Sequence, residues 1–355
     1  MTPWAIQPLP VPESLDSPGA AGFLSVAELF NAQQRAVWGN DDFAQTPEAQ
    51  LARLGSTRTR RRQLLVAGSG EEILGVAQLN IPLTDNLHAA TVNVVVDSSF
   101  RRRGIGTALC AAVEKLAAAE SRRTLIAETE HLVAGEGQRA AAGPASFIPD
   151  DAAASFAAAC GFSLALVERI SRLDLPAAGT DIAAPDAAPR TGYELLFWGD
   201  ACPGTLVDAY AQLRQKMSTD APQGGLELVP ELWDQARVRE AEAKARAMGY
   251  NVLVCAVRHA ATGELAGHTV LETGRKNPAV AYQDDTLVLG SHRGNGLGLM
   301  MKAANLERLQ KLFPGVQRVY TWNAEENRHM LDINEKLGFN AIGYSGEWQK
   351  DSRAG

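Results

Sequence analysis

Two short phrases in this sequence combine arginine and glycine in a spacing that suits phosphate binding. Arg101-Arg102-Arg103-Gly104-Ile105-Gly106 follows an apolar run that ends at Val96, and Arg293-Gly294-Asn295-Gly296-Leu297-Gly298 follows a run that includes Leu287 and Val288. Each reads Arg-x-x-Gly-x-Gly. Where such a phrase leaves a strand and opens a helix, glycines give an anion access to unpaired backbone N–H groups, and arginine adds charge. The sequence therefore predicts two phosphate-binding turns.

The elements that must position these turns repeat along the chain. In the first half, we expect a helix, three strands, the helix after Gly104, a strand, a helix and a strand, at residues 24–37, 63–67, 73–81, 91–96, 105–116, 124–127, 151–159 and 162–170. In the second half, we expect strands at 194–198, 252–257, 265–271, 286–289 and 316–322, helices at 205–217, 230–248, 296–312 and 326–337, and a closing strand. Each half is predicted to be a mixed α/β unit with a mostly antiparallel sheet flanked by helices.

The stretch between the halves has the composition of a linker. Residues 173–192 are rich in Ala, Pro, Gly and Asp, without helical or strand periodicity. We therefore expect domains at 1–172 and 193–355. The two phrases lie 192 residues apart, whereas the later Gly-Phe pairs at Gly161 and Gly338 lie 177 apart, which predicts an insertion within 131–149 of the first half.

Composition limits the class of protein. The 355 residues are 46% apolar and 21% charged, which is typical of a globular protein. No apolar stretch is long enough to span a membrane, and the start of the chain lacks a secretory signal. The net charge of −7 disfavours nucleic acid as the main partner, and the four scattered cysteines predict reduced thiols without a metal site. We expect a cytoplasmic monomer or homodimer.

Two other glycine-turn architectures fit poorly. A dinucleotide-binding domain requires Gly-x-Gly-x-x-Gly, and a nucleotide-binding P-loop requires Gly-Lys-Ser/Thr, and neither occurs at these turns. Both phrases resemble the signature of the GNAT acetyltransferases, Gln/Arg-x-x-Gly-x-Gly/Ala between a V-shaped strand and a helix. The later segment of that family is similar to Asn327-Arg328-His329-Met330 followed by Leu337-Gly338-Phe339. The chain thus resembles a tandem GNAT protein, with the double-domain architecture of mycothiol synthases.

The resemblance implies that acetyl-CoA is the co-substrate. The backbone from Arg293 to Gly298 would hold its pyrophosphate, Leu287 and Val288 would pair with the pantetheine arm, and Asn327 would reach the coenzyme. Val96 and Arg101 to Gly106 are the corresponding residues of the first half. The family often places a general-acid Tyr seven residues after the Asn, where this chain has Asn334. The first half has Asp150 and Ala157 instead of the Asn and the Tyr, so we expect the second half to be catalytic.

Acidic residues near the second phrase are the candidates for removing a proton from an attacking amine. Asp284 and Asp285 precede the phrase on its strand, Glu272 lies on the strand before, and Glu325 follows the next strand. Alternation along a strand puts Asp284 and Asp285 on opposite faces, so at most one should face the substrate. Exposed strand-end charge is the alternative interpretation for both.

The leading hypothesis is an N-acetyltransferase that transfers an acetyl group from acetyl-CoA to a small primary amine by direct attack in a ternary complex, without a metal. Architecture alone suggests an amino-thiol sugar as the acceptor. The alternatives are a non-catalytic acyl-CoA-binding or regulatory protein, because both halves lack the Tyr, and an enzyme that acetylates protein N-termini or lysines.

Overall fold

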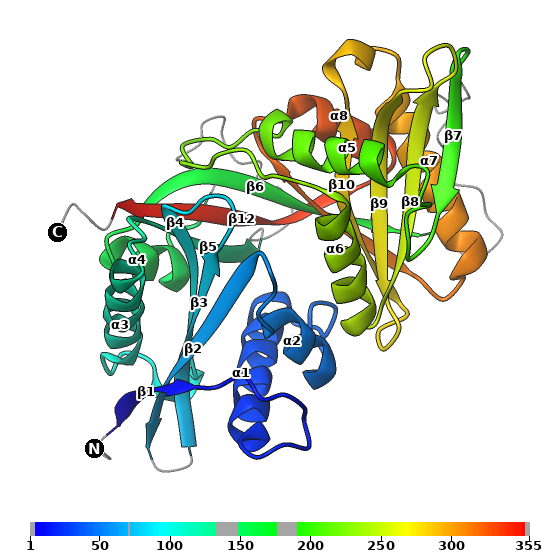
Figure 1. Cartoon of the computed structure of the whole chain (residues 1–355). Helices are drawn as coiled ribbons and strands as arrows, with labels where there is room; N and C mark the ends of the chain where they lie inside the picture. Colours follow the sequence, from blue (N-terminus) through cyan, green and yellow to red (C-terminus); the bar gives the residue numbers. More distant parts are fainter. Residues whose placement is uncertain (1–3, 70–71, 133–147, 176–189, 352–355) are drawn as a thin grey trace. The chain divides into compact units, whose positions relative to one another are not determined.

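The computed structural model describes residues 4–69, 72–132, 148–175 and 190–351, and its contacts divide the chain into two compact units. The first unit comprises Met1–Val167, Gln223–Leu228 and Tyr344–Gly355. The second unit comprises Glu168–Pro222 and Val229–Gly343. Figure 1 labels their helices and strands.

The first unit has its strands in the order β1-β2-β3-β4-β5-β12-β6. Strands β1 to β4 pair antiparallel, whereas β4 and β5 are parallel. Helices α1 and α2 pack on one face, and α3 and α4 on the other. The elements are β1 (Ala5–Leu9), α1 (Ala20–Trp38), α2 (Pro47–Leu54), β2 (Arg60–Ser69), β3 (Glu72–Pro82), β4 (Ala89–Val96), α3 (Ile105–Ala119), β5 (Thr124–Leu132), α4 (Ala152–Ala159) and parts of β6 (Ser163–Asp174) and β12 (Asn340–Asp351).

The second unit repeats this plan, with the order β6-β11-β10-β9-β8-β7. Here β10 and β11 are the parallel pair. Helices α5 and α6 cover one face, and α7 and α8 cover the other (Figure 1). The elements are β7 (Tyr193–Trp198), α5 (Val207–Asp220), α6 (Gln235–Ala247), β8 (Tyr250–His259), β9 (Leu265–Gly274), β10 (Val280–Val288), α7 (Leu297–Leu312), β11 (Arg318–Ala324) and α8 (Arg328–Lys336). The predicted pair of mixed, mostly antiparallel α/β units is thereby confirmed.

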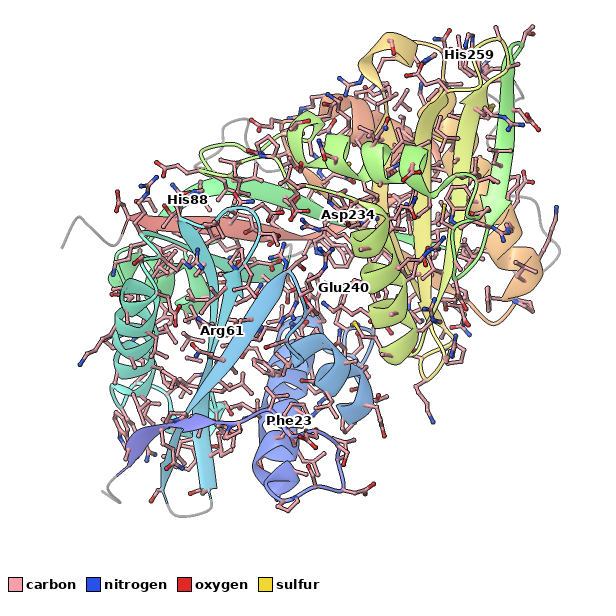
Figure 2. The ribbon with its side chains drawn as sticks, viewed as in Figure 1. Phe23, Arg61, His88, Asp234, Glu240 and His259 are labelled. Atoms are coloured by element: carbon pink, nitrogen blue, oxygen red, sulfur yellow. The ribbon has the colours of Figure 1, made fainter. Side chains whose placement is uncertain are left out.

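Local sequence sets several helix starts. Asp234 precedes α6, and its Oδ1 accepts the backbone N–H of Arg237 at 2.7 Å; Figure 2 labels Asp234. Thr46 caps α2 in the same way, with Pro47 at the first helical position. No helix within the described ranges is both long and apolar enough to cross a membrane.

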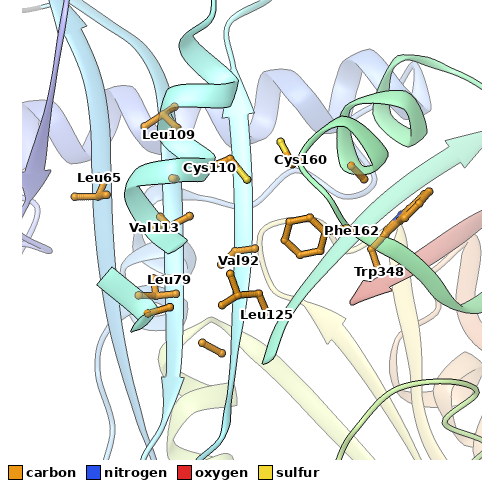
Figure 3. Close-up of a cluster of buried hydrophobic side chains, with 14 of the residues drawn as sticks. Leu65, Leu79, Val92, Leu109, Cys110, Val113, Leu125, Cys160, Phe162 and Trp348 are labelled. Atoms are coloured by element: carbon orange, nitrogen blue, oxygen red, sulfur yellow. The ribbon is translucent and has the colours of Figure 1, made fainter. Parts of the chain in front are cut away.

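The core of the first unit includes a residue from the far end of the chain. Leu79, Val92, Leu109 and Leu125 pack between the sheet and α3, as Figure 3 shows, and Trp348 of β12 joins the same cluster. The Trp348 side chain is buried, and its Nε1 donates to Thr129 Oγ1 at 2.7 Å. The C-terminal strand therefore completes the packing of the first unit.

The predicted boundaries fall largely outside the described residues. Only 173–175 and 190–192 of the linker, and only 131–132 and 148–149 of the expected insertion, are described. The division into domains 1–172 and 193–355 stays a prediction, while the compact units show that Gln223–Leu228 and the residues from Tyr344 onward pack with the first unit.

Replacing Trp348 by Ala should destabilise the first unit by about 3–5 kcal/mol, because a buried aromatic side chain and its hydrogen bond are lost. Urea unfolding of the full chain measures this change. Leu312→Ala, at a site with 54% of the residue exposed, is the control and should have little effect. Equal stability of the Trp348→Ala protein and the unaltered chain would contradict the packing role of the strand.

Candidate active site

The two Arg-x-x-Gly-x-Gly phrases follow the same backbone path. Each leaves its strand, passes through a short 3-10 turn at Ser98–Phe100 or Gly290–His292, and enters a helix at a glycine. Gly104 and Gly296 precede α3 and α7 with φ of +81° and +69°. Glycine is favoured there because other residues are strained in this left-handed region. The first N–H groups of both helices have no partner inside the helix and can serve an anion.

The last glycine of each phrase has a different role. A Cβ at Gly106 would lie 3.1 Å from Phe156 of α4, and a Cβ at Gly298 would lie 3.1 Å from Ile333 of α8. These glycines allow the start of the helix to pack closely on the neighbouring helix. By contrast, a Cβ at Gly104 would meet no atom within 4 Å. The two glycines of a phrase therefore shape the turn and pack its helix.

The first arginine of each phrase braces the turn. Arg101 Nε donates to Val96 O and Arg293 Nε donates to Val288 O, both at 3.1 Å. The Nη2 of Arg101 donates to Gln33 Oε1 at 2.7 Å, and that of Arg293 to Asp220 Oδ2 at 2.9 Å. These contacts tie the turn to the preceding strand and to α1 or α5. They leave the backbone N–H groups as the main donors of the turn.

A cation that the sequence analysis did not select lies beside the second turn. The Nη2 of Arg190 is 2.8 Å from the position that a Cβ on Gly296 would take. Arg190 comes from the end of the predicted linker, so composition gave no indication of its place.

The parallel strands part at the same point in both units. Strands β4 and β5 form four residue pairs that end at Val92–Ala127, and β10 and β11 form four that end at Gln283–Thr321. In each pair, both strands continue past this point. The later residues of β4 and β10 thus keep a backbone edge that can accept an added strand-like chain.

The strands that lead into the two turns differ in one respect: β10 has a β-bulge in its pairing with β9, and β4 has none in its pairing with β3. The register of β10 against β9 shifts between Gln283 and Thr286, whereas β4 pairs with β3 from Thr91 to Val96 without a shift. The amide of Gln283 stabilises the bulge, since its Nε2 donates to Val270 O at 2.6 Å and to Thr269 Oγ1 at 3.0 Å. The bulge places one more residue in β10 than in β4.

This bulge brings Asp284 and Asp285 to one cation. Arg214 Nη1 lies 3.6 Å from Asp284 Oδ2 and 3.0 Å from Asp285 Oδ2. The expectation that alternation would separate the two carboxylates onto opposite faces was therefore wrong, because a bulge interrupts alternation. Arg214 belongs to α5, and its guanidinium stacks on Trp233 at 4.6 Å.

Glu272 of β9 belongs electrostatically to the same group. Burial, and then the charge of Asp284, raise the pKa of Glu272 to about 8. Desolvation by the surrounding protein, and then the charge of Asp285, raise the pKa of Asp284 to about 6. This shift occurs although 45% of the Asp284 side chain is exposed. We call Glu272, Asp284 and Asp285 with Arg214 the carboxylate cluster. Two of its carboxyls can bind and release protons near neutral pH.

Aromatic and imidazole side chains complete the surroundings of the cluster. His268 is fully buried on β9, where burial, and then the charge of Arg214, lower its pKa to about 3, so the imidazole is neutral. Its ring lies edge-on to Tyr210 of α5, with centroids 5.4 Å apart. Sequence analysis missed Arg214, Tyr210 and His268. Their spacing was the available signal: Tyr210 and Arg214 are four apart on a helix, and His268 and Glu272 are four apart on a strand.

The remaining predicted residues lie in other contacts. Glu325 is buried and pairs with Arg169, whose Nη2 lies 3.2 Å from Glu325 Oε2. Asn327 caps α8, with its Oδ1 accepting the N–H of Met330 at 3.3 Å. Thus three of the four predicted carboxylates gather around Arg214, and Glu325 is paired elsewhere. Of the described residues, no group of His, Cys, Asp and Glu is arranged to hold a metal ion.

The first unit has a titratable carboxyl of its own. Burial, and then the charge of Glu128, raise the pKa of Glu130 on β5 to about 7. Trp38 Nε1 donates to Glu130 Oε2 at 3.1 Å. The regular pairing of β4 leaves this unit without a counterpart of the Asp284–Asp285 bulge.

The sequence matches the Acetyltransferase (GNAT) family over residues 23–134 and 213–339. Each matched region contains one phrase, one parallel strand pair and the helix that follows the turn. No curated protein matches the sequence significantly.

Several solved structures share the whole arrangement. A tandem GNAT protein from the clavulanic acid biosynthesis pathway, solved without AcCoA, is 26% identical with a TM-score of 0.78, and the match covers 99% of both chains. A GCN5-related N-acetyltransferase from Sphaerobacter thermophilus is 15% identical with a TM-score of 0.63, covering 98% of this chain and 96% of the other. A glucosamine N-acetyltransferase region of a fungal multi-domain β-N-acetylglucosaminidase is 14% identical with a TM-score of 0.65. This match covers 99% of this chain and 38% of the other. The last two likenesses concern the fold alone.

Replacing Glu272 by Gln should stabilise the protein in a pH-dependent way. The folded state holds this proton up to about pH 8, whereas the ordinary pKa is 4.5, so the native chain loses stability as pH rises between these values. The stability gain of Glu272→Gln should therefore be absent near pH 4 and largest above pH 8. Each pKa unit corresponds to about 1.4 kcal/mol, and partial exposure of the side chain reduces the total.

Urea unfolding at several pH values measures this gain. Glu307→Gln, on the exposed side of α7, is the matched control. A gain that is constant from pH 4 to pH 9 would rule out the raised pKa of Glu272.

Proposed function

Since this chain belongs to the GNAT family of acetyltransferases, we propose that it transfers an acetyl group from acetyl-CoA to the primary amine of a small molecule, and that the second unit carries out the reaction. The observation that carries this proposal is the bulge that gathers Asp284 and Asp285 beside Glu272, on the strand that leads into the second turn.

The second turn suits the coenzyme. Its helix start and the neighbouring Arg190 favour a pyrophosphate, and the open edge of β10 at Leu287 and Val288 suits the amide groups of a pantetheine arm. Backbone N–H groups from Gly294 to Gly298 would be the donors. The first turn has the same backbone path, so coenzyme binding there is compatible with the proposal.

The carboxylate cluster suits an amine. An amine arrives mostly as an ammonium ion, which the carboxylates of the cluster attract. A carboxylate then takes the ammonium proton, and the neutral nitrogen attacks the thioester carbon. The C–N bond forms, the C–S bond breaks, the electron pair remains on sulfur, and the second amine proton passes to a carboxylate or to water.

A small-molecule acceptor is favoured over a protein by the likeness to the tandem GNAT protein of the clavulanic acid biosynthesis pathway, which matches this chain over nearly its full length.

Replacing the carboxylates of the cluster by neutral amides should lower the rate of acetyl transfer without preventing acetyl-CoA binding. At least one of Glu272→Gln, Asp284→Asn and Asp285→Asn should lower kcat by about 10²- to 10⁴-fold, the usual contribution of a general base, while acetyl-CoA still binds. In the native chain, kcat/KM should rise with pH through the range of about 6 to 8, because the carboxyls of raised pKa must be ionised to accept a proton. Steady-state kinetics with a panel of amines and calorimetric titration with acetyl-CoA measure both quantities.

Native turnover in all three variants would exclude the cluster as the base. Acetyl-CoA binding without turnover of any amine would favour the regulatory alternative, and the absence of acetyl-CoA binding would refute the proposal itself.

Two glycine variants, one in each turn, should show which unit acts. Gly296→Ala and Gly104→Ala each place a Cβ on a left-handed residue, at a cost of roughly 1–2 kcal/mol. The Cβ of Gly296→Ala would also meet Arg190 Nη2 at 2.8 Å, whereas that of Gly104→Ala would meet no atom within 4 Å. Gly296→Ala should lower turnover about tenfold, since each 1.4 kcal/mol of lost binding or barrier is about tenfold. Gly104→Ala should leave turnover near the native value. The reverse result would move the reaction to the first unit.

A further inference from the structure

A buried lysine of the second unit is linked through two asparagines to the place where β10 and β11 part. Lys302 of α7 has 1% of its surface exposed, and its Nζ donates to Asn334 Oδ1 at 2.6 Å. Asn334 is equally buried, and its Nδ2 donates to Asn323 Oδ1 at 2.6 Å. The three side chains form one directed chain of hydrogen bonds that begins at the Nζ of Lys302.

The last member of this chain lies next to the open edge of β10. Asn323 is on β11, two residues beyond Thr321, which forms the last parallel pair with Gln283. It is only partly buried. Its Oδ1 accepts from Asn334, and its Nδ2 carries N–H donors that Asn323 can offer to a substrate. Cooperative polarisation makes such donors stronger when a cation stands at the far end of the chain.

The lysine is costly to keep at this position. Burial lowers the pKa of Lys302 to about 7, and no charged side chain of the described ranges contributes to that shift. The centroid of the Phe339 ring lies 5.6 Å from Nζ. An amine with this pKa is partly neutral near pH 7, because an ammonium group buried without a carboxylate would destabilise the fold. An anion brought near the chain would stabilise the ammonium form.

The first unit has the same turn without this chain. Cys110 is the sixth residue of α3, as Lys302 is the sixth of α7. Thr129 occupies the place of Asn323, two residues beyond the last parallel pair, and its hydroxyl bonds with His131 and Trp348. The turn and its helix therefore form without a buried lysine. In the first unit, the Nζ of Lys350 lies 5.9 Å over Phe162 but donates to Cys160 O, so the asparagine chain from Lys302 is a feature of the second unit.

We propose that Lys302 is a positioning residue, which acts through Asn334 and Asn323 to stabilise the negative charge on the coenzyme A sulfur as the thioester bond breaks. This inference rests on the proposed function. When the C–S bond breaks, the electron pair stays on sulfur, and the thiolate needs a positive field until it leaves or takes a proton from water. Asn334 is the residue that stands where the family often has its general-acid Tyr, and here it passes on the field of a cation in place of a proton.

The pKa of the bound coenzyme A thiol tests this inference directly. The full-length protein is saturated with coenzyme A, and thiolate absorbance in the ultraviolet is followed against pH, with desulfo-coenzyme A as the reference that removes the protein's own thiols and tyrosines. In the native protein, the bound thiol should titrate at a lower pH than the thiol of free coenzyme A, which is titrated in the same way for comparison. Lys302→Met should raise the pKa of the bound thiol by at most about one unit, because a charge that acts through two asparagines lies farther from the sulfur than a direct neighbour would.

Two further variants sharpen the test. Asn323→Ala cuts the chain at its partly exposed end while Lys302 and Asn334 stay paired, and it should raise the thiol pKa in the same direction. Lys311→Met removes an exposed lysine from the same helix and should leave the thiol pKa at the native value. Lys302→Met should also lower kcat about tenfold with an unchanged Kd for acetyl-CoA, whereas a merely structural lysine would leave the thiol pKa of the folded variant unaltered.

The outcomes separate the two proposals. An unchanged thiol pKa in Lys302→Met and Asn323→Ala, with coenzyme A still bound, would overturn the role of Lys302 and leave the proposed function standing. If Lys302→Met does not fold, Asn323→Ala decides by the same measurement. Failure of the native protein to bind coenzyme A would overturn the proposed function, and the inference with it.

Discussion

The extra residue in β10 is the constraint on which the arrangement of the second unit depends. From Val92 to Val96 in the first half there are four steps to the end of the strand, and from Gln283 to Val288 there are five. A strand that keeps its pairing cannot accommodate the additional residue without a bulge. Gln283 fixes the bulge by donating to Val270 O and Thr269 Oγ1. Beyond it, β10 resumes its pairing with β9 and leads into the turn as β4 does.

The bulge also determines the electrostatics. It presents two adjacent carboxylates to Arg214 of α5, within reach of the charge of Glu272 on the neighbouring strand. Burial, and then repulsion between the carboxylates, raise the pKa of Glu272 and of Asp284, so these two carboxyls retain protons to higher pH. The same repulsion is relieved by any incoming cation. The strand irregularity is therefore the physical origin of a group that can both attract an ammonium ion and take its proton.

Short-range sequence patterns were enough to predict much of the fold and both turns. The Arg-x-x-Gly-x-Gly phrases and the helical spacing after them depend on a few consecutive residues, so both turns and both α/β units could be predicted. The gathering of Asp284 with Asp285 could not, because regular alternation was assumed. The extra step in β10 can be counted only from the last parallel pair of each unit, which the sequence does not show.

Other features depend on contacts between residues far apart in sequence. Trp348 packs in the first unit on β12, and Lys302 meets Asn334 across 32 residues. Nothing in the local sequence distinguishes these residues from an exposed tryptophan, lysine or asparagine. Arg190 is a similar case, since its surroundings in the chain have the composition of a linker, yet its guanidinium reaches Gly296. Sequence patterns do not predict the role of a residue when that role depends on a contact with a distant part of the chain.

The carboxylate cluster and the buried Lys302 lie on opposite faces of the second sheet. The carboxylate cluster belongs to the face that α5 and α6 cover, as the contacts of Asp284 and Asp285 with Arg214 require. The chain from Lys302 belongs to the face of α7 and α8. In amine acetylation, the nitrogen must lose positive charge while the sulfur gains negative charge. If the thioester lay where the pairing of β10 with β11 ends, the carboxylate cluster would be on one side of it and the chain from Lys302 on the other. Such a field favours the separated charges of the transition state over the neutral thioester, which is the condition for catalysis rather than mere binding.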